Sequence, residues 1–137
     1  MRKVFVNLTA HNLTEEQVEE AKRRFGVSEF LSAEDILDKE VVAKLRQSPG
    51  NIEELRALAL DVAEVLEQYA RKNNVELYVH LPAGSPAFMW VLSLVWPYGW
   101  AIPVFSHSRR EVIEEKKDDG SVVKRSVFRF EGYIVDV

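Results

Sequence analysis

The chain has 137 residues, 47% of them hydrophobic and 29% charged, which suits one compact domain with a hydrophobic core. This composition excludes disordered, collagen-like and low-complexity proteins. The absence of cysteine excludes disulfides, thiolate nucleophiles and cysteine-ligated zinc, and it fits a reducing compartment. The formal charge of −4 argues against attraction to long nucleic acid but leaves room for a small anionic ligand.

We expect a cytoplasmic protein without a targeting signal or a membrane span. Residues 1–7 turn polar before a signal-peptide core can form. The longest apolar stretch, Ala87 to Phe105, is interrupted by Pro97, Gly99 and Pro103. Its uninterrupted part is too short to cross a bilayer.

The first part of the chain predicts a strand, a helix and a second strand. The β-branched and aromatic run from Lys3 to Leu8 is typical of a strand. A capping-box pattern at Thr14–Gln17 predicts a helix from Glu15 to Phe25 that ends at Gly26. Val27 to Leu31 then predicts a short second strand.

Two further helices are expected next. Ser32–Asp35 repeats the cap pattern and predicts a helix that runs to about Gln47, followed by a turn at Ser48–Gly50. Asn51 is expected to cap the longest helix. One face of that helix is predicted to be buried, because its apolar residues follow the helical period: Ile52, Leu55, Ala59, Val62, Leu66 and Tyr69.

The rest of the chain predicts a strand, a helix, a strand and a hairpin. Strands are expected over Val75–Leu81 and Ala101–Phe105, with an apolar helix over Pro86–Trp96 between them. From Glu111 onward, two polar strand-like runs flank the turn signal Asp118-Asp119-Gly120, and the second run is expected to bend at Gly132.

This alternation predicts a Rossmann-like α/β fold, with a mainly parallel sheet, helices on both faces and a C-terminal β-hairpin. We expect a single domain over residues 1–137, with a core over 1–105 and the hairpin as an extension over 106–137. In such sheets ligands bind outside the carboxyl ends of the strands. That rule selects three predicted loops: Asn7 to Asn12, Pro82 to Ser85, and Ser106 to Arg110.

The middle loop has the features of an anion site. Gly84, Ser85 and Pro86 place a permissive glycine, an N-cap and an N1 proline before the predicted helix. Unlike the earlier helices, this one carries no carboxylate in its first turn, and no charged residue lies between Leu77 and Ser108. The positive end of its dipole is then available to a phosphate. The alternative is a buried helix whose apolar surroundings exclude charges.

The other two loops supply polar side chains. Ser106 to Arg110 brings two hydroxyls, His107 and two guanidiniums to a strand end, and a guanidinium can donate two hydrogen bonds to one phosphate. The alternative is a solvated strand end with ordinary ion pairs. The first loop contributes Thr9, His11 and Asn12, although His11 also fits a plain surface position.

Several standard chemistries lack their sequence marks. The three histidines, His11, His80 and His107, are not at local metal-ligand spacings, and His80 fits a packed position in a strand, so no metal site is predicted. No P-loop, dinucleotide fingerprint, nucleophile elbow or zincin motif occurs. No cofactor is expected.

The chain resembles the CRISPR-associated Rossmann-fold proteins, especially the small stand-alone members of type III systems, which include ring nucleases. The resemblance rests on three segments and spans most of the chain: Val4 to Gln17, Ala83-Gly84-Ser85-Pro86, and Ile102 to Val112. It implies a homodimer that binds a cyclic oligoadenylate, such as the tetra-adenylate, at its two-fold axis. The aromatic-rich segments Phe88-Met89-Trp90 and Trp96 to Trp100 are a candidate interface, with core packing as the alternative.

The resemblance also implies metal-independent ring cleavage, in which a ribose 2′-hydroxyl attacks the adjacent phosphodiester. On matching positions, the amides of Gly84 and Ser85 with Arg109 and Arg110 would hold phosphates, Thr9 and Ser106 would orient ribose hydroxyls, and His11 would transfer protons. Asn12, Pro86, His107 and Ser108 would complete the binding site. The predicted catalytic residues are His11, Ser106, Arg109 and Arg110.

The sequence leaves two alternatives open. Ring nucleases often use a lysine, and none lies in the three loops, so a non-catalytic nucleotide-binding or sensor module is one alternative. An α/β interaction domain without a nucleotide ligand is the other.

Overall fold

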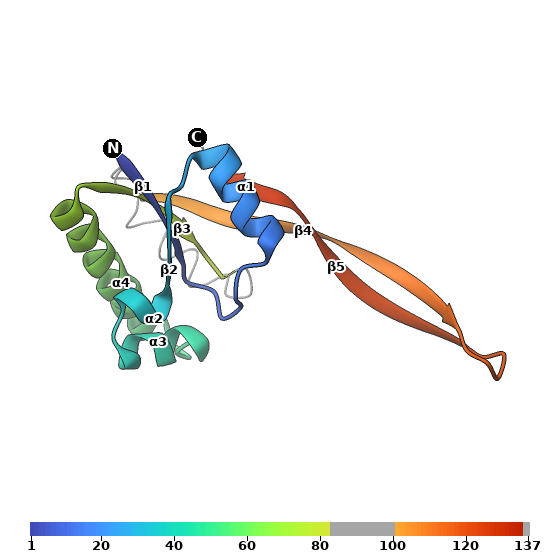
Figure 1. Cartoon of the computed structure of the whole chain (residues 1–137). Helices are drawn as coiled ribbons and strands as arrows, with labels where there is room; N and C mark the ends of the chain where they lie inside the picture. The colour runs from blue at the N-terminus through green and yellow to red at the C-terminus, as the bar shows by residue number, and fades with distance from the viewer. Residues whose placement is uncertain (83–100, 136–137) are drawn as a thin grey trace.

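A five-stranded sheet of order β2-β1-β3-β4-β5 forms the centre of the computed structural model, which describes residues 1–82 and 101–135 (Figure 1). The first four strands in this order are parallel, and β5 pairs with β4 in the antiparallel direction. The strands are β1 (Arg2–Asn7), β2 (Glu29–Ser32), β3 (Val75–His80), β4 (Ala101–Lys116) and β5 (Val122–Val135). The predicted α/β class, the mainly parallel sheet and the C-terminal hairpin are confirmed.

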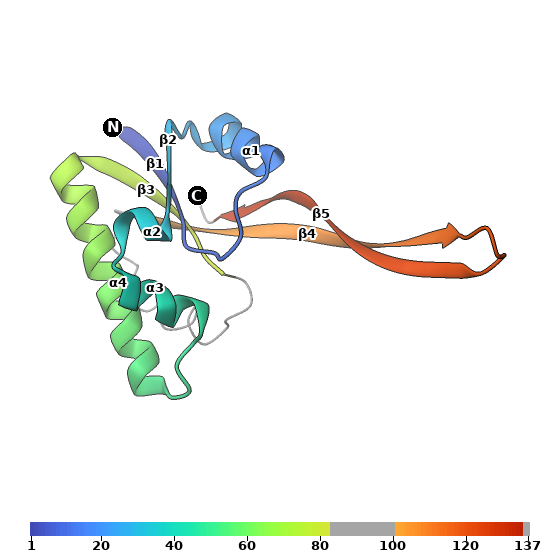
Figure 2. The same ribbon diagram turned by 60° about the horizontal axis from the view of Figure 1, so that its bottom comes forward.

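Helices cover both faces of the sheet, as predicted (Figures 1 and 2). One face carries α1 (Glu15–Phe25), and the other carries α4 (Ile52–Asn73). Two shorter helices precede α4 on its side of the sheet: α2 (Ala33–Ile36) and α3 (Lys39–Arg46).

The alternation of side chains along the strands produces two cores. Phe5 and Tyr78 face α1, where Phe25 stacks on Tyr78 with 4.6 Å between ring centroids. Their neighbours Val6 and Val79 point the other way, into the core under α4. Because each buried side chain of this size contributes roughly 1.5–3 kcal/mol, this alternation fixes which face of each strand meets which helix.

The predicted limits of α1 and the start of α4 are confirmed. The Thr14 hydroxyl accepts a hydrogen bond from the Gln17 amide at 3.2 Å, and the Thr14 amide donates to Gln17 Oε1 at 2.9 Å. Gly26 ends α1 in the left-handed region, at φ 71°. Asn51 caps α4 by accepting from the Glu54 amide at 2.9 Å.

The face of α4 is buried largely as predicted. Four of the six expected positions lie in the core: Leu55, Ala59, Val62 and Leu66. Tyr69 packs against the edge of this core, but Ile52 is 43% exposed. Ile52 is the first residue of the helix, so it lies at the end of the packed face.

The single helix expected to run to Gln47 is wrong, because the segment forms α2 and α3 instead. The chain becomes extended at Leu37, whose side chain is buried in the core under α4. Asp38 then starts a new helix by accepting a hydrogen bond from the Val41 amide at 3.0 Å. The break therefore combines burial of an apolar side chain with a new N-cap.

The loop expected at Ser106 to Arg110 is also wrong, because β4 continues without interruption through these residues. β5 lies alongside from Val104 to Lys116 and supplies backbone partners for the whole length. Past a shift in register at His107, residues 108–116 of β4 and 122–130 of β5 form a ribbon that projects from the molecule (Figures 1 and 2). Both faces of such a ribbon meet water, so polar residues suit it.

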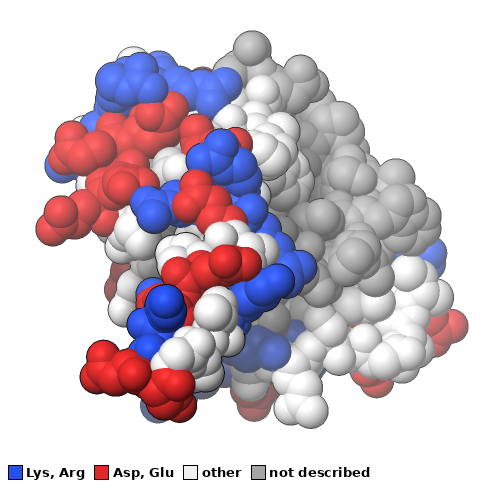
Figure 3. Space-filling view, turned by 90° about the vertical axis from the view of Figure 1, so that its right-hand side faces the viewer, with Lys and Arg blue, Asp and Glu red and all other residues white. Residues whose placement is uncertain are grey.

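The expected hairpin turn and bend are confirmed. Gly120 lies in the turn at φ 87°, and the register shifts between His107 and Ser108 opposite Gly132, which has φ 146°. Oppositely charged residues face each other across the ribbon, with Arg125 and Glu115 2.9 Å apart. Seen from the end of the molecule where the ribbon projects, Lys and Arg are intermixed with Asp and Glu over the surface (Figure 3).

Several predictions fall on residues outside those that the structure describes. These are the helix over Pro86–Trp96, the anion loop at Gly84, Ser85 and Pro86, and the aromatic region Phe88 to Trp100. Among the described helices, none is both long and apolar enough to cross a membrane.

Candidate functional site

A pocket of about 660 Å³ opens at the carboxyl ends of β1 and β3, beside β4. The crossover from β1 to β2 places α1 on one face of the sheet, and the return to β3 places α4 on the other, so the strand order reverses between β1 and β3. This is the position where open α/β sheets bind ligands. Its described lining is Thr9, Ala10, His11, Gln17, Leu45, Arg46, Ser48, His80, Leu81, Pro82, Ser106, His107, Ser108 and Phe128.

The chemistry of this lining differs from that of the rest of the molecule. All three histidines of the chain contribute to it, although they are far apart in sequence. The chain carries 22 acidic residues, yet none is among the described lining residues, which include one charged side chain, Arg46. The pocket therefore favours a ligand that carries negative charge and accepts or donates hydrogen bonds.

A chain of hydrogen bonds runs across the three central strands at the floor of the pocket. His80 Nδ1 lies 3.0 Å from Asn7 Oδ1, and His80 Nε2 lies 2.7 Å from Ser106 Oγ. Asn7 and His80 are register partners, and Ser106 stands two residues beyond Val104, the partner of His80 on β4. All three side chains point toward the α1 side because they continue the alternation of Phe5, Tyr78 and Val104.

Helix α1 and strand β5 complete this chain. Gln17 Nε2 donates to Ser106 Oγ at 3.1 Å, while Gln17 Oε1 accepts from the Thr14 amide in the capping box. The Tyr133 hydroxyl donates to the Gln17 carbonyl oxygen at 2.8 Å. Burial raises the pKa of Tyr133, so the phenol remains protonated and keeps this donor.

His80 is neutral at physiological pH. Its residue is 3% exposed, and burial lowers the pKa of the imidazole to about 4. The rings of Phe5 and Tyr133 lie beside it, each with its centroid 5.7 Å from that of the imidazole. A neutral imidazole has one N–H donor and one acceptor nitrogen, so His80 donates to one of its two partners and accepts from the other.

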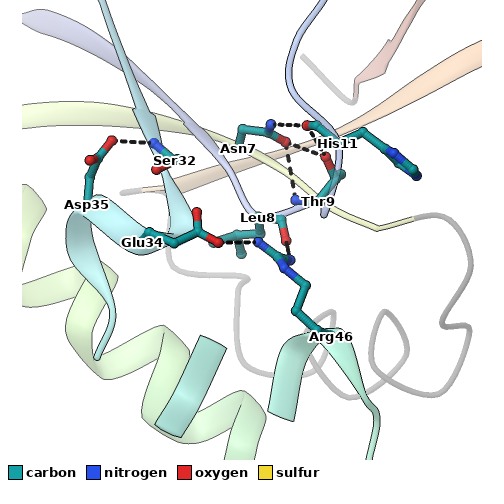
Figure 4. Close-up of polar contacts among 8 residues, drawn as sticks. All are labelled: Asn7, Leu8, Thr9, His11, Ser32, Glu34, Asp35 and Arg46. Atoms are coloured by element: carbon teal, nitrogen blue, oxygen red, sulfur yellow. Dashed lines mark hydrogen bonds and ion pairs between the residues drawn. The ribbon is translucent and has the colours of Figure 1, made fainter. Parts of the chain in front are cut away.

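The loop after β1 is held by Asn7 (Figure 4). Asn7 Nδ2 donates to the His11 carbonyl oxygen at 2.8 Å, and Asn7 Oδ1 accepts from the Thr9 hydroxyl at 2.6 Å. The proton of the Thr9 hydroxyl is thereby used, so toward a ligand this oxygen is an acceptor. The imidazole of His11 extends away from this cluster, free of its hydrogen bonds (Figure 4).

Arg46 reaches the pocket from the last turn of α3. Its Nη1 donates to the Leu8 carbonyl oxygen at 2.8 Å, and its Nη2 lies 3.0 Å from Glu34 Oε1 (Figure 4). A backbone hydrogen bond, followed by the bond to Arg46, lowers the pKa of Glu34. These contacts tie the guanidinium between α2 and the end of β1, so its position is set before a ligand arrives.

Five of the predicted site residues line this one pocket: Thr9, His11, Ser106, His107 and Ser108. Asn12, Arg109 and Arg110 lie outside the described lining. Arg109 pairs with Glu111 at 2.7 Å, and Arg110 donates through Nε and Nη2 to the Ser126 hydroxyl. Both guanidiniums thus support the ribbon. Gly84, Ser85 and Pro86 lie outside the described residues.

Four contributors were missed by the sequence argument: Asn7, Gln17, Arg46 and His80. A signal for two of them was present, since β1, β3 and β4 each reach this edge with two apolar residues followed by a polar one: Phe5-Val6-Asn7, Tyr78-Val79-His80 and Val104-Phe105-Ser106. Gln17 was recognised only as a cap residue. Arg46 lies 38 residues from its partner Leu8, and no local pattern indicates that contact.

The three histidines do not form a metal site in the described part of the chain. There, no group of three or more His, Asp or Glu side chains is arranged to hold a metal ion. His107 faces the ribbon, where its Nε2 lies 3.4 Å from Glu131 Oε2. His80 has both nitrogens engaged in the floor of the pocket.

Comparison with known proteins assigns the chain to a family. No curated protein and no solved structure matches it. A sequence model for the family described as "Uncharacterized protein MJ1673 family" matches residues 3–134, a range that includes every strand core and all the residues of the pocket. The chain therefore belongs to the uncharacterized protein MJ1673 family.

Proposed function

We propose that the pocket binds a phosphate-bearing nucleotide ligand, the cyclic oligoadenylate implied by the sequence resemblance, and cleaves a phosphodiester bond in it without a metal. The observation that carries this proposal is the convergence of all three histidines on a pocket whose described lining has no carboxylate. The volume of about 660 Å³ falls in the range of roughly 300–1,000 Å³ typical of small-molecule sites.

The charge distribution supports an anionic ligand. The chain as a whole has a formal charge of −4, whereas the described pocket lining contributes the guanidinium of Arg46 and no carboxylate. The guanidinium of Arg46 lies at this pocket with its position set by Leu8 and Glu34, and a guanidinium suits a phosphate because it can donate several hydrogen bonds. Hydroxyl and amide groups around it suit the ribose and phosphate oxygens.

The proposed reaction needs two proton transfers and no metal. In a ribonucleotide ring, the 2′-oxygen attacks the adjacent phosphorus, its proton leaves, and the departing 5′-oxygen takes up a proton. His11 lines the pocket, and its imidazole extends away from the contacts of Asn7, so we assign to it the transfer of one of these protons (Figure 4). The strand ends hold the lining residues in fixed positions, and such alignment of the reacting groups contributes more to the reaction rate than any single contact.

A homodimer belongs to this proposal. A cyclic ligand with two-fold symmetry presents the same nucleotide face twice, so two copies of one pocket related by a two-fold axis would engage both halves. Light scattering at micromolar concentration is expected to report two chains per particle. A monomer would contradict this part of the proposal.

The test is incubation of the protein with cyclic tetra-adenylate and cyclic hexa-adenylate in EDTA, with mass analysis of the products and calorimetry for binding. The informative variant is Arg46→Ala, and its matched control is Lys44→Ala, an exposed cation on the same helix that does not line the pocket. Loss of a hydrogen bond to a charged group is expected to weaken binding by about 1.5–3 kcal/mol for Arg46→Ala alone.

The outcomes separate the alternatives. Binding with linear products supports a ring nuclease, and binding without turnover supports the non-catalytic sensor module. If neither cyclic oligoadenylate binds, the proposal is wrong. It is also wrong if Arg46→Ala and Lys44→Ala both bind the ring as tightly as the unmodified protein does.

A further inference from the structure

We infer that Ser106 is an activated nucleophile that reacts covalently with electrophilic acyl and phosphoryl esters, with His80 as its base and Asn7 as the positioning residue. This inference goes beyond the proposed function, in which the nucleophile is a hydroxyl of the ligand itself. It rests on the geometry of three side chains from three adjacent strands.

The orientation of the Asn7 amide determines which nitrogen of His80 carries the proton. Asn7 Nδ2 donates to the His11 carbonyl oxygen at 2.8 Å, which only an NH₂ group can do. Asn7 Oδ1 in turn accepts from the Thr9 amide at 3.2 Å and from the Thr9 hydroxyl at 2.6 Å. The oxygen therefore faces His80 Nδ1, and that nitrogen must be the donor.

With the proton on Nδ1, the other nitrogen of the neutral ring has a free lone pair. The partner of His80 Nε2 is Ser106 Oγ at 2.7 Å, so the serine hydroxyl donates and the imidazole accepts. A nucleophile within hydrogen-bond reach of a base, which is itself oriented by a third group, is the arrangement that activates serine in enzymes.

Ser106 is also accessible and assisted on its other side. It is half-buried and lines the pocket, whereas most of His80 is covered. Gln17 Nε2 donates to Ser106 Oγ at 3.1 Å, and the capping box holds that amide through Gln17 Oε1. This donor stabilises the negative charge that builds on Oγ as its proton leaves.

The step balances with groups that the site contains and with water. Ser106 Oγ forms a bond to the acyl carbon or the phosphorus, and its proton moves to His80 Nε2. The bond to the leaving group breaks, and the leaving alcohol or phenol takes that proton. Water then releases the acid, transferring one proton through His80, and Ser106 regains its hydroxyl. Because Asn7 is neutral, it orients the ring without stabilising an imidazolium, so we expect both the formation and the hydrolysis of the covalent serine adduct to be slow.

The test uses diisopropyl fluorophosphate on the full chain, with intact-protein mass and peptide mapping as readouts. Here the bond from phosphorus to fluorine breaks, fluoride leaves, and the proton on His80 passes to solvent. We expect a single adduct that maps to Ser106 rather than to Ser108, and none on the protein unfolded in urea. An adduct elsewhere, or no adduct on the folded protein, would overturn the inference whatever the variants do.

Variants assign the roles. Ser106→Ala should abolish the adduct, and His80→Gln should slow its formation by about 100-fold or more, the usual effect of losing a general base. Ser28 is an exposed serine between α1 and β2, so Ser28→Ala is the matched control and should be labelled at the rate of the unmodified protein. Equal labelling of His80→Gln and the unmodified protein, with both folded by circular dichroism, would show that His80 is not the base.

The role of Asn7 has its own readout. In the unmodified protein, ¹⁵N NMR should show His80 protonated at Nδ1 and unprotonated at Nε2, and Asn7→Ala should populate the other tautomer and slow labelling. A proton on Nε2 in the unmodified protein would overturn the inference. Because these experiments use no nucleotide, labelling without ring binding refutes only the proposed function, and ring cleavage without labelling refutes only this inference.

Discussion

Three polar residues, Asn7, His80 and Ser106, follow the core positions on the α1 side of β1, β3 and β4, and they form a hydrogen-bonded row beside the pocket, which His80 and Ser106 line. Two residues earlier on the same strands, the side chains on this face are apolar and buried in the core under α1: Phe5, Tyr78 and Val104. A buried polar group without a partner would cost several kcal/mol, and Asn7 and Ser106 together supply a partner for each nitrogen of His80. The polar floor is thus both a structural requirement of the sheet and the chemical part of the site.

Burial of His80 predicts a pH-dependent stability. The unfolded chain binds a proton at this imidazole with a pKa near 6.5, whereas the folded protein does so only near pH 4. Between these values the unfolded state binds more protons, so the free energy of unfolding falls as the pH is lowered, by about 2 kcal/mol from this group between pH 7 and pH 5.

Urea unfolding at pH 7, 6 and 5 measures this effect. His80→Gln removes the titrating group. Between pH 7 and pH 5 its free energy of unfolding should therefore fall by about 2 kcal/mol less than that of the unmodified protein, even though the variant is less stable at every pH. Ser28→Ala, which removes an exposed serine and no titrating group, should keep the pH dependence of the unmodified protein. Parallel slopes for His80→Gln and the unmodified protein would contradict the prediction.

The sequence indicated the edge of the sheet that holds the site but not the network within it. Thr9, His11 and Ser106 were found because polar residues that follow an apolar strand fall at its carboxyl end. His80 was interpreted as a packed residue because the sequence does not show that Asn7 and Ser106 reach its two nitrogens. That relation depends on the register of β1, β3 and β4, which a single sequence does not encode locally.

At the scale of elements, local signals predicted the helix ends more accurately than the helix interiors. The limits of α1 follow from Thr14, Gln17 and Gly26, which act within one turn. The break between α2 and α3 was missed because residues 33–46 lack glycine and proline, and only tertiary burial of Leu37 makes the extended conformation favourable. Asp38, a good N-cap residue, was the available signal.

This break makes Asp38 a test of how α3 is held. Asp38→Ala removes the cap bond to the Val41 amide, so the free energy of unfolding should fall by about 1 kcal/mol. Asp61→Ala, at an exposed position inside α4, is the matched control and should change it by less than about 0.5 kcal/mol.

Urea titration of both variants measures the difference. Because α3 carries Arg46, Asp38→Ala should also weaken anion binding, while Asp61→Ala should not. A loss in the control as large as that in Asp38→Ala would show that charge, rather than capping, is responsible.

At the scale of the whole molecule, the ribbon formed by the ends of β4 and β5 is separate from the core. Every side chain from residue 114 to residue 124 is exposed, and the ion pairs across the ribbon are exposed as well. Such pairs contribute between zero and about 1 kcal/mol each, and an isolated two-stranded hairpin is only marginally stable. The ribbon therefore contributes little to the stability of the fold.

Shortening the ribbon tests this separation. Replacing residues 114–124 by Asn-Gly joins the register partners Ile113 and Arg125 through a two-residue turn. The free energy of unfolding should change by less than about 1 kcal/mol in urea titrations. A loss above about 2 kcal/mol would show that the ribbon packs on the core in solution.

The partners in the pocket floor also determine when the site can exist during folding. Asn7 and His80 are 73 residues apart in sequence, and His80 and Ser106 are 26 apart, whereas the strands of the ribbon are joined by a tight turn. Closing the longer loops costs more chain entropy, so the ribbon is expected to form early and the β1–β3 pairing late on the folding pathway. The site around Ser106 is then complete only after β1 and β3 have paired, late on the folding pathway.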